Sequence, residues 1–155
     1  MNAEASTAIR VAGPGDAALL AHLRYQWRAG ERGERGLDRA SFLQELRTWM
    51  ESHSSTHIPF LALIDGDPVA MGWLALVDRI PGPQHFIRRS AYVQSVYVDA
   101  SCRSMGIGTS LVKFILEHAR GLGLEYLAVH PSELSFTLYR RLGFTDATRA
   151  LELRY

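Results

Sequence analysis

Residues 98–109 read VDASCRSMGIGT and join an apolar, β-rich run to an amphipathic run with helical spacing. Two glycines at such a junction usually mark a close approach of backbone to something else. A helix N-terminus carries unpaired N–H groups and a partial positive charge, which attract phosphates. Gly106 and Gly108 carry no side chain that would block a phosphate, and Arg103 can add a cation. The stretch therefore suits a pyrophosphate, although the same glycines would also let a helix pack closely on a sheet.

Two common nucleotide-binding loops do not fit this stretch. A Walker loop requires Gly-Lys-Ser/Thr, whereas Gly108 is followed by Thr109 and no lysine. A Rossmann fingerprint requires a third glycine where Leu111 stands, and an acidic residue at the end of the next strand. That strand ends at Val129 and His130 instead.

The pattern on either side predicts an α/β fold in which helices flank a mixed central sheet. Asp16 and Asp38 are expected to cap the first two helices, and residues 28–39 between them to form a mobile surface loop. The order of elements, antiparallel first and alternating later, favours a single domain over residues 1–155. Strands are expected at Ala8–Ala12, Phe60–Ile64, Val69–Val77, Ala91–Val98 and Glu125–Val129, helices at 17–27, 39–50, Thr109–Arg120 and 131–143, and two extended segments in 144–155.

Composition limits the class of partner. The 155 residues are 47% hydrophobic, which suits one core, and the net charge of +1 is not gathered into basic or acidic blocks. We therefore expect neither a nucleic acid nor a membrane as partner. Cys102 is the only cysteine and the six histidines show no ligand spacing, so no metal site is predicted. The absence of a secretory signal and of a bilayer-spanning run favours a cytoplasmic protein.

Two motifs in order resemble the GNAT family of acetyl-CoA-dependent N-acetyltransferases. Residues 103–108, RSMGIG, match the family's Arg/Gln-x-x-Gly-x-Gly/Ala loop, and Leu138–Phe144, LYRRLGF, is similar to its tyrosine-bearing helix and Leu-Gly-Phe ending. One helix and one strand separate the motifs, as in the family. The resemblance implies acetyl-CoA as co-substrate and a GNAT-like arrangement of the whole chain.

The resemblance also implies where acetyl-CoA binds. The pyrophosphate would lie on the loop backbone, and the pantetheine arm would pair like an extra strand with the strand before it. Ser132 stands where many members have an asparagine, and it would either hydrogen-bond the cofactor or only cap the tyrosine helix. The implied cofactor-binding residues are Val96, Tyr97, Val98, Arg103, Ser104, Met105, Gly106, Ile107, Gly108, Thr109 and Ser132.

Catalysis requires a neutral amine to attack the thioester and a proton for the departing thiolate. Tyr139 occupies the position of the family's tyrosine, which hydrogen-bonds the sulfur and acts as general acid. Some members carry a glutamate on the strand before the loop, but Tyr92 stands there. The general base is left open among His85, His130, Glu31, Glu34 and a chain of water molecules. An acyl-cysteine at Cys102 is disfavoured, because that residue lies on the pyrophosphate side.

The predicted function is direct transfer of an acetyl group to a primary amine of a small molecule or peptide. The alternatives are a non-catalytic acyl-CoA sensor and a transferase for a different acyl group. The acceptor is expected between the loops 29–39 and 78–89, where aromatic residues would line it. Those aromatic residues are Trp27, Trp73, Phe86 and Tyr92. Because family members often pair through their C-terminal strands, residues 144–155 could support a homodimer.

Overall fold

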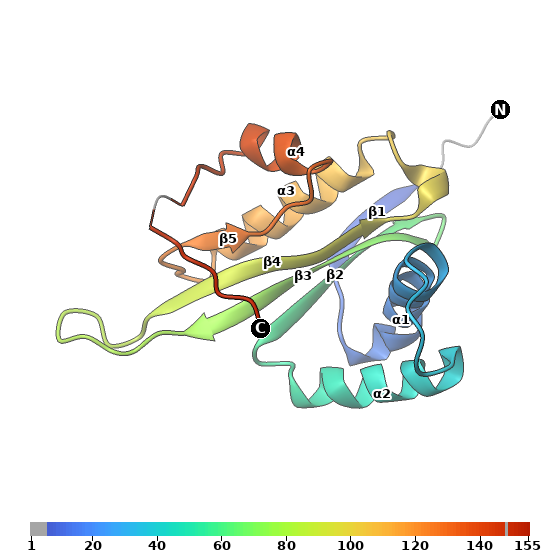
Figure 1. Ribbon diagram of the computed structural model, residues 1–155, viewed down its shortest axis with the longest axis horizontal. Coiled ribbons are helices and arrows are strands. Elements are labelled where there is room, and N and C mark those ends of the chain that lie inside the picture. The colour runs from blue at the N-terminus through green and yellow to red at the C-terminus, as the bar shows by residue number, and fades with distance from the viewer. Residues whose placement is uncertain (1–5, 148) are drawn as a thin grey trace.

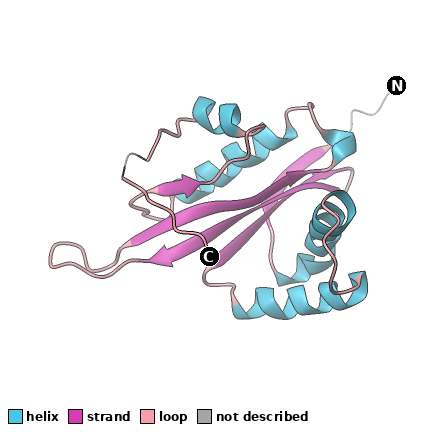
Figure 2. Cartoon of the chain, in the orientation of Figure 1, coloured by secondary structure: helices cyan, strands magenta, loops and turns pink. Residues whose placement is uncertain are grey.

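A five-stranded sheet in the order β1-β2-β3-β4-β5 organises the part of the chain that the computed structural model describes, residues 6–147 and 149–155 (Figure 1). The first four strands are antiparallel to their neighbours, and β5 runs parallel to β4. The predicted class, an α/β fold with helices flanking a mixed sheet, is confirmed (Figure 2). The strands are β1 Thr7–Val11, β2 His57–Ile64, β3 Asp67–Asp78, β4 Arg89–Val98 and β5 Leu127–Val129.

Helices cover both faces of the sheet. One face carries α1 (Ala17–Tyr25) and α2 (Arg39–Ser52), and the other carries α3 (Ile107–Arg120) and α4 (Phe136–Arg141) (Figure 1). Central strands buried on both faces read as unbroken apolar runs rather than alternating ones. This explains the continuous apolar run in β2, which forms a hairpin with β3.

The helix α3 presses against β3 at Gly72. A Cβ atom on this glycine would lie 2.8 Å from Ile115 Cδ1 and 3.3 Å from Val96 Cγ2, so the glycine allows the close contact. The buried face of α3 consists of Ile107, Leu111, Val112, Ile115 and Ala119. Their spacing of three and four residues is the amphipathic pattern from which the sequence predicted this helix.

The first helix is longer than the sequence predicted. It continues from α1 into a π-helical segment, η2, over Gln26–Glu31. The expected mobile loop 28–39 was therefore wrong over residues 28–31. Side-chain contacts far along the chain hold η2 in place: Gln26 donates to Asp99 and Tyr97 donates to Glu31, both at 2.6 Å. Such contacts leave no periodic signal in a segment rich in Gly, Glu and Arg.

The two expected helix caps have different outcomes. Asp38 accepts a hydrogen bond from Ser41 N at 2.8 Å and caps α2 as predicted. Asp16 does not cap α1. Its carboxylate accepts from Gly13 N at 3.1 Å and pairs with Arg10, and it thereby closes the short 3₁₀ turn η1 (Pro14–Asp16) that precedes α1.

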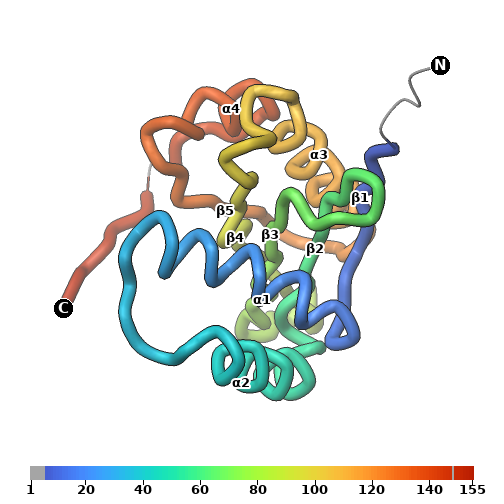
Figure 3. Tube along the Cα trace, turned by 90° about the vertical axis from the view of Figure 1, so that its right-hand side faces the viewer, coloured from blue at the N-terminus to red at the C-terminus, as the bar shows by residue number. Residues whose placement is uncertain are grey.

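The two extended segments expected in residues 144–155 are not strands in residues 144–147 and 149–155. The last residues lie outside the helical layers (Figure 3). The side chains of Leu151, Leu153 and Tyr155 are exposed. An extended segment becomes a strand only where a neighbouring strand is available to pair with it. None of the described helices is long and apolar enough to cross a bilayer.

Candidate functional site

The strands β4 and β5 separate part of the way along β4. β5 pairs with Ala91–Val93 and no further, while β3 pairs with β4 as far as Val98. Asp99 N donates to Val69 O of β3 at 2.8 Å. Because backbone groups alternate in direction along a strand, those of Val96 and Val98 point away from β3, toward the space that β5 has left. Two residues of β4 therefore present backbone groups to an opening in the sheet.

A β-bulge at Ser95 sets this arrangement. The register between β3 and β4 shifts there, since Trp73 pairs with Gln94 whereas Met71 pairs with Tyr97. Ser95 has a φ of 53°, in the left-handed region that non-glycine residues seldom adopt. The extra residue lets the side chains of Val93 and Val96 pack against the same core, the one under α3. The sequence analysis missed the bulge, because Gln94 and Ser95 continue an ordinary strand pattern.

The glycine loop follows β4 and opens α3. Asp99 accepts from Ser101 N at 2.9 Å and so caps the short 3₁₀ turn η3 (Ala100–Cys102). Gly106 has a φ of 79° and is the N-cap of α3 without any side-chain cap. Ser110 N donates to Gly106 O at 3.0 Å, so the N–H groups of residues 107–109 precede the first helical hydrogen bond. They are available to an anion.

The two glycines have different roles. A Cβ atom on Gly106 would meet nothing within 4 Å, so this residue is glycine for its backbone conformation. A Cβ atom on Gly108 would lie 3.4 Å from Val98 Cγ2, an ordinary van der Waals contact, so the packing of α3 on β4 does not by itself require glycine at this position. Neither glycine of the loop is therefore needed to make room for the helix against the sheet.

Arg103 is tied to η2. Its Nε donates to Val98 O at 3.0 Å, and its Nη2 donates to both carboxylate oxygens of Glu31, at 3.0 and 2.9 Å. The bond from the Tyr97 hydroxyl and those from Arg103 hold the pKa of Glu31 below its ordinary value. A carboxylate so occupied is a weak base, which disfavours Glu31 as the general base. Nothing in the local sequence links Glu31 to residues that lie 66 and 72 positions away.

Tyr139 lies on α4 against the core beneath α3, with 4% of its surface exposed. Its ring meets that of Phe144 edge to face, with 5.4 Å between centroids. Burial raises the pKa of Tyr139 to about 12, so its phenol stays protonated at neutral pH. The residue also lines a cleft of about 860 Å³ between β5, α4 and the segment after α4. Tyr92 and His130 line the same cleft, with ring centroids 6.1 Å apart.

Other residues expected at the site lie apart. His85 and Phe86 belong to the β3–β4 loop, which projects from the opposite end of the sheet from residues 31–38 (Figure 1). The two loops expected to enclose the acceptor are therefore not brought together. Trp73 is 8% exposed and belongs to the core under α1 and α2. Ser132 does not cap α4, because that helix begins after Ser135. The hydroxyl oxygens of Ser132 and Ser135 lie 3.0 Å apart.

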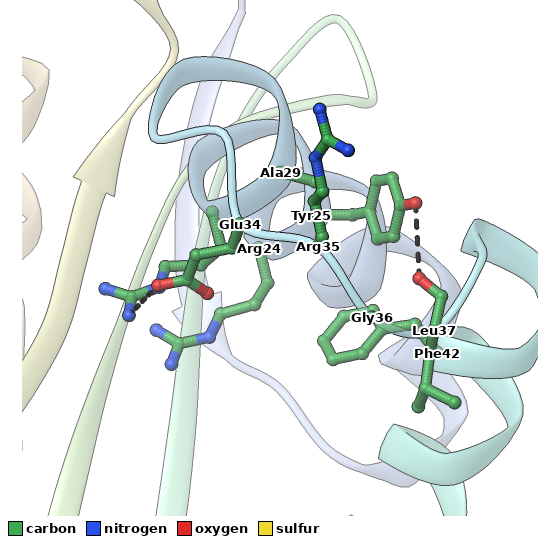
Figure 4. Close-up of a pocket in the computed structure, with 9 residues that line it drawn as sticks. Arg24, Tyr25, Ala29, Glu34, Arg35, Gly36, Leu37 and Phe42 are labelled. Carbon is green, nitrogen blue, oxygen red and sulfur yellow. Dashed lines mark hydrogen bonds and ion pairs between the residues drawn. The ribbon is translucent and has the colours of Figure 1, made fainter.

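A smaller pocket of about 240 Å³ lies between α1, η2 and the segment that leads to α2 (Figure 4). The Tyr25 hydroxyl donates to Leu37 O at 3.3 Å on one side of it, and Arg28 forms an ion pair with Glu34 on the other. Among the described residues, no group of three or more His, Cys, Asp and Glu is placed to hold a metal ion.

The fold is shared with solved acetyltransferase structures. A predicted acetyltransferase with acetyl-CoA from Clostridium acetobutylicum superposes with a TM-score of 0.76 at 22% identity, covering 96% of each chain. An aminoglycoside acetyltransferase from an uncultured soil metagenomic sample, in complex with sisomicin, gives a TM-score of 0.75 at 16% identity. That comparison covers 96% of this chain and 95% of the other. The chain thus shares its overall fold with these solved structures.

Sequence comparison identifies the family. The profile of the Acetyltransferase (GNAT) family matches residues 21–144, which include the glycine loop and the tyrosine helix. The chain belongs to this family of N-acetyltransferase enzymes. A curated relative, glucosamine 6-phosphate N-acetyltransferase 1 of Oryza sativa subsp. japonica, is 29% identical over 106 residues. The matched region is 66% of this chain and 64% of the rice protein, so it spans less than two thirds of that relative.

The Glu31 contacts predict how stability depends on pH. A carboxyl group whose pKa is lowered by folding stabilises the protein above its unfolded pKa, and this contribution is lost as the pH falls through the folded pKa. The substitution Glu31→Gln should therefore lower the free energy of unfolding at pH 7, by an amount that shrinks as the pH falls below the ordinary pKa of a glutamate, about 4.3. Urea unfolding at several pH values measures the difference. Equal curves for both proteins at pH 7 would contradict the prediction.

Proposed function

We propose that this protein transfers the acetyl group of acetyl-CoA directly to a primary amine of a small molecule or peptide. The observation that carries the proposal is the opening between β4 and β5 directly before the uncapped N-terminus of α3. An acyl-CoA thioester carries a pyrophosphate, an extended amide-bearing arm and a polarised carbonyl. The opening offers, in the same order, free helix N–H groups, unpaired strand backbone and a cleft lined by Tyr139.

Each part of acetyl-CoA has a proposed partner. The pyrophosphate lies on the loop from Ser104 to Thr109, where the helix dipole and free N–H groups favour an anion. The amides of the pantetheine arm pair with backbone of β4, chiefly Val96, because Val98 O already accepts from Arg103. Tyr97, expected among the cofactor-binding residues, makes no direct contact in this arrangement, because its backbone faces β3 and its hydroxyl donates to Glu31. The exposed Ser132 hydroxyl contributes a further polar contact.

The reaction follows from these positions. The lone pair of a neutral amine attacks the thioester carbonyl carbon, a carbon–nitrogen bond forms, and the carbon–sulfur bond then breaks. Tyr139 donates a hydrogen bond to the departing sulfur, and its pKa of about 12 keeps the proton available. The proton lost by the amine passes to water or to His130, which lines the cleft that Tyr139 also borders. The thiol of coenzyme A and the amide are the products.

The first experiment is thermal unfolding with acetyl-CoA, coenzyme A, NAD and ATP in parallel. A ligand present at 100 times its dissociation constant stabilises the folded state by roughly 2.7 kcal/mol, a shift of several degrees. We expect shifts with acetyl-CoA and coenzyme A alone. Release of free thiol from acetyl-CoA in the presence of pooled amines, including glucosamine 6-phosphate and an aminoglycoside, then measures transfer.

Two glycine variants test whether the loop is the binding site. Gly106 and Gly66 both have positive φ, at 79° and 87°, and at both a Cβ atom would meet open space. Alanine should therefore strain both backbones by a similar amount, roughly 1–2 kcal/mol. Only Gly106→Ala should lose the stabilisation by acetyl-CoA, whereas Gly66→Ala should keep it. No shift with millimolar acetyl-CoA for the unmodified protein would overturn the proposal, and a shift without amine transfer would indicate an acyl-CoA sensor.

Tyr139→Phe tests the role of the phenol. Phenylalanine retains the packing of this buried ring, so the folded state should persist while kcat falls by about 10²–10⁴. The acetyl-CoA-induced shift in melting temperature should change little. Tyr155→Phe, at the exposed chain end, is the matched control and should retain full turnover. Unchanged kcat for Tyr139→Phe at saturating substrates would remove Tyr139 from the mechanism.

The C-terminal segment supports a homodimer. Leu151, Leu153 and Tyr155 alternate with Glu152 and Arg154, the pattern of a strand with one buried face, and yet the three apolar side chains are exposed. Pairing of this segment with a second copy would bury them. Light scattering during gel filtration should give twice the 17.3 kDa mass of one chain. The double variant Leu151→Asp/Leu153→Asp should give the mass of one chain. A monomeric unmodified protein would contradict the pairing.

A further inference from the structure

Three arginines surround one tryptophan on the helix α1–η2. Arg24, Arg28 and Arg32 follow each other at intervals of four residues, so they share one side of the helix. Their guanidinium carbons lie 5.5, 5.5 and 5.2 Å from the centroid of the Trp27 ring. The ring in turn stacks on Tyr97 of β4, with 5.5 Å between centroids. We refer to Arg24, Arg28 and Arg32 as the arginine cluster.

The cluster carries more positive charge than its surroundings offset. Arg24, Arg28 and Arg35 line the small pocket in Figure 4, and Glu34 is the one carboxylate among the described residues that line it. Glu34 is paired with Arg28, and Glu31 is occupied by Arg103. Arg28 Nε is buried and has no hydrogen-bond partner among the described residues. Burial, then the neighbouring Arg28 and Arg32, lower the pKa of Arg24. Like charges held together in this way favour a bound anion.

The cluster lies where the reaction would take place. Arg24 Nη1 donates to Ser95 Oγ at 2.8 Å, and Ser95 is the bulge at which β4 parts from β5. In the proposed complex the pyrophosphate lies on the loop after β4, and the arm runs back along Val98 and Val96. The thioester therefore arrives near Ser95. An anion held by Arg24 would lie beside the acyl group and not beside the cofactor phosphates.

We propose that the acceptor is a small amine that also bears an oxyanion group, a phosphate or a carboxylate, and that the arginine cluster binds this group. The inference rests on the proposed acetyl transfer and narrows its substrate class. Guanidinium groups bind oxyanions through paired, charge-assisted hydrogen bonds. Stacking on Trp27 fixes their orientation before binding. Polyamines, which carry only positive charge, are repelled from this site.

Matched pairs of acceptors test the proposal. Glucosamine 6-phosphate and glucosamine differ only in the phosphate, and an amino acid and its α-amide differ only in the carboxylate. The members of each pair are compared as acceptors at saturating acetyl-CoA. We expect at least one charged member to have a kcat/KM more than tenfold above that of its neutral counterpart. Arg24→Gln and Arg28→Gln should each lower kcat/KM for the charged amine about tenfold or more. In both variants the ratio of kcat/KM for the charged amine to that for the neutral amine should therefore fall about tenfold or more, while the KM for acetyl-CoA remains within about twofold.

The control variant is Arg47→Gln, an exposed arginine of α2, which should behave as the unmodified protein. Melting temperatures with and without acetyl-CoA establish that each variant is folded. Equal transfer to charged and neutral members of both pairs overturns this inference and leaves the proposed function intact. A rise in KM for acetyl-CoA in the arginine variants also overturns it, because the cluster would then serve the cofactor. Failure to acetylate any amine, charged or neutral, overturns the proposed function itself.

Discussion

The parting of β4 from β5 is the constraint on which the rest of the site depends. In a closed sheet the backbone N–H and C=O groups of neighbouring strands pair with each other. Here β5 pairs with β4 only at Ala91–Val93, so the backbone groups of Val96 and Val98 face an opening. Ser95 makes this possible by holding a left-handed conformation, a strain of roughly 1–3 kcal/mol that packing on both faces must offset. Gly72 leaves room for the side chains of Ile115 on α3 and Val96 on β4, which pack together over β3 in the same region. Side-chain packing thus supports β4 beside the opening.

Charged and polar side chains join the glycine loop after β4 to the helix α1–η2. Arg103 closes the loop on Val98 O and reaches Glu31 of η2, while Asp99 caps η3 and accepts from Gln26 of the same helix. These side chains connect the segment after β4 to the helix that carries the arginine cluster. A change in the conformation of the loop would therefore also change the contacts that hold η2. Each pair is partly exposed, so the coupling depends on several contacts acting together.

Periodic features of the molecule could be predicted from its sequence, whereas long-range pairing could not. The strands β2, β3 and β4 could be predicted from their apolar runs, and the helix α3 from its helical spacing of apolar residues. Two short motifs indicated the family. The bulge at Ser95 has no signal of its own, because one additional polar residue looks like a continued strand. The Glu31 contacts depend on residues far along the chain. The strands expected in residues 144–155 are not formed, because an extended segment also needs a neighbouring strand with which to pair.

The arginine cluster bears on the missing general base. The ten residues of β4 include no carboxylate, so a proton acceptor of the kind expected there is absent from the strand. Amines near neutral pH are mostly protonated and must lose a proton before they attack. In the proposed complex, guanidinium groups beside the thioester would disfavour a second positive charge and so lower the pKa of an incoming ammonium group. The oxyanion of the acceptor would hold the molecule in place against this repulsion. The arginine cluster would then bind the acceptor through its oxyanion and also favour the neutral form of its amine. Water would suffice to accept the proton that the ammonium group loses.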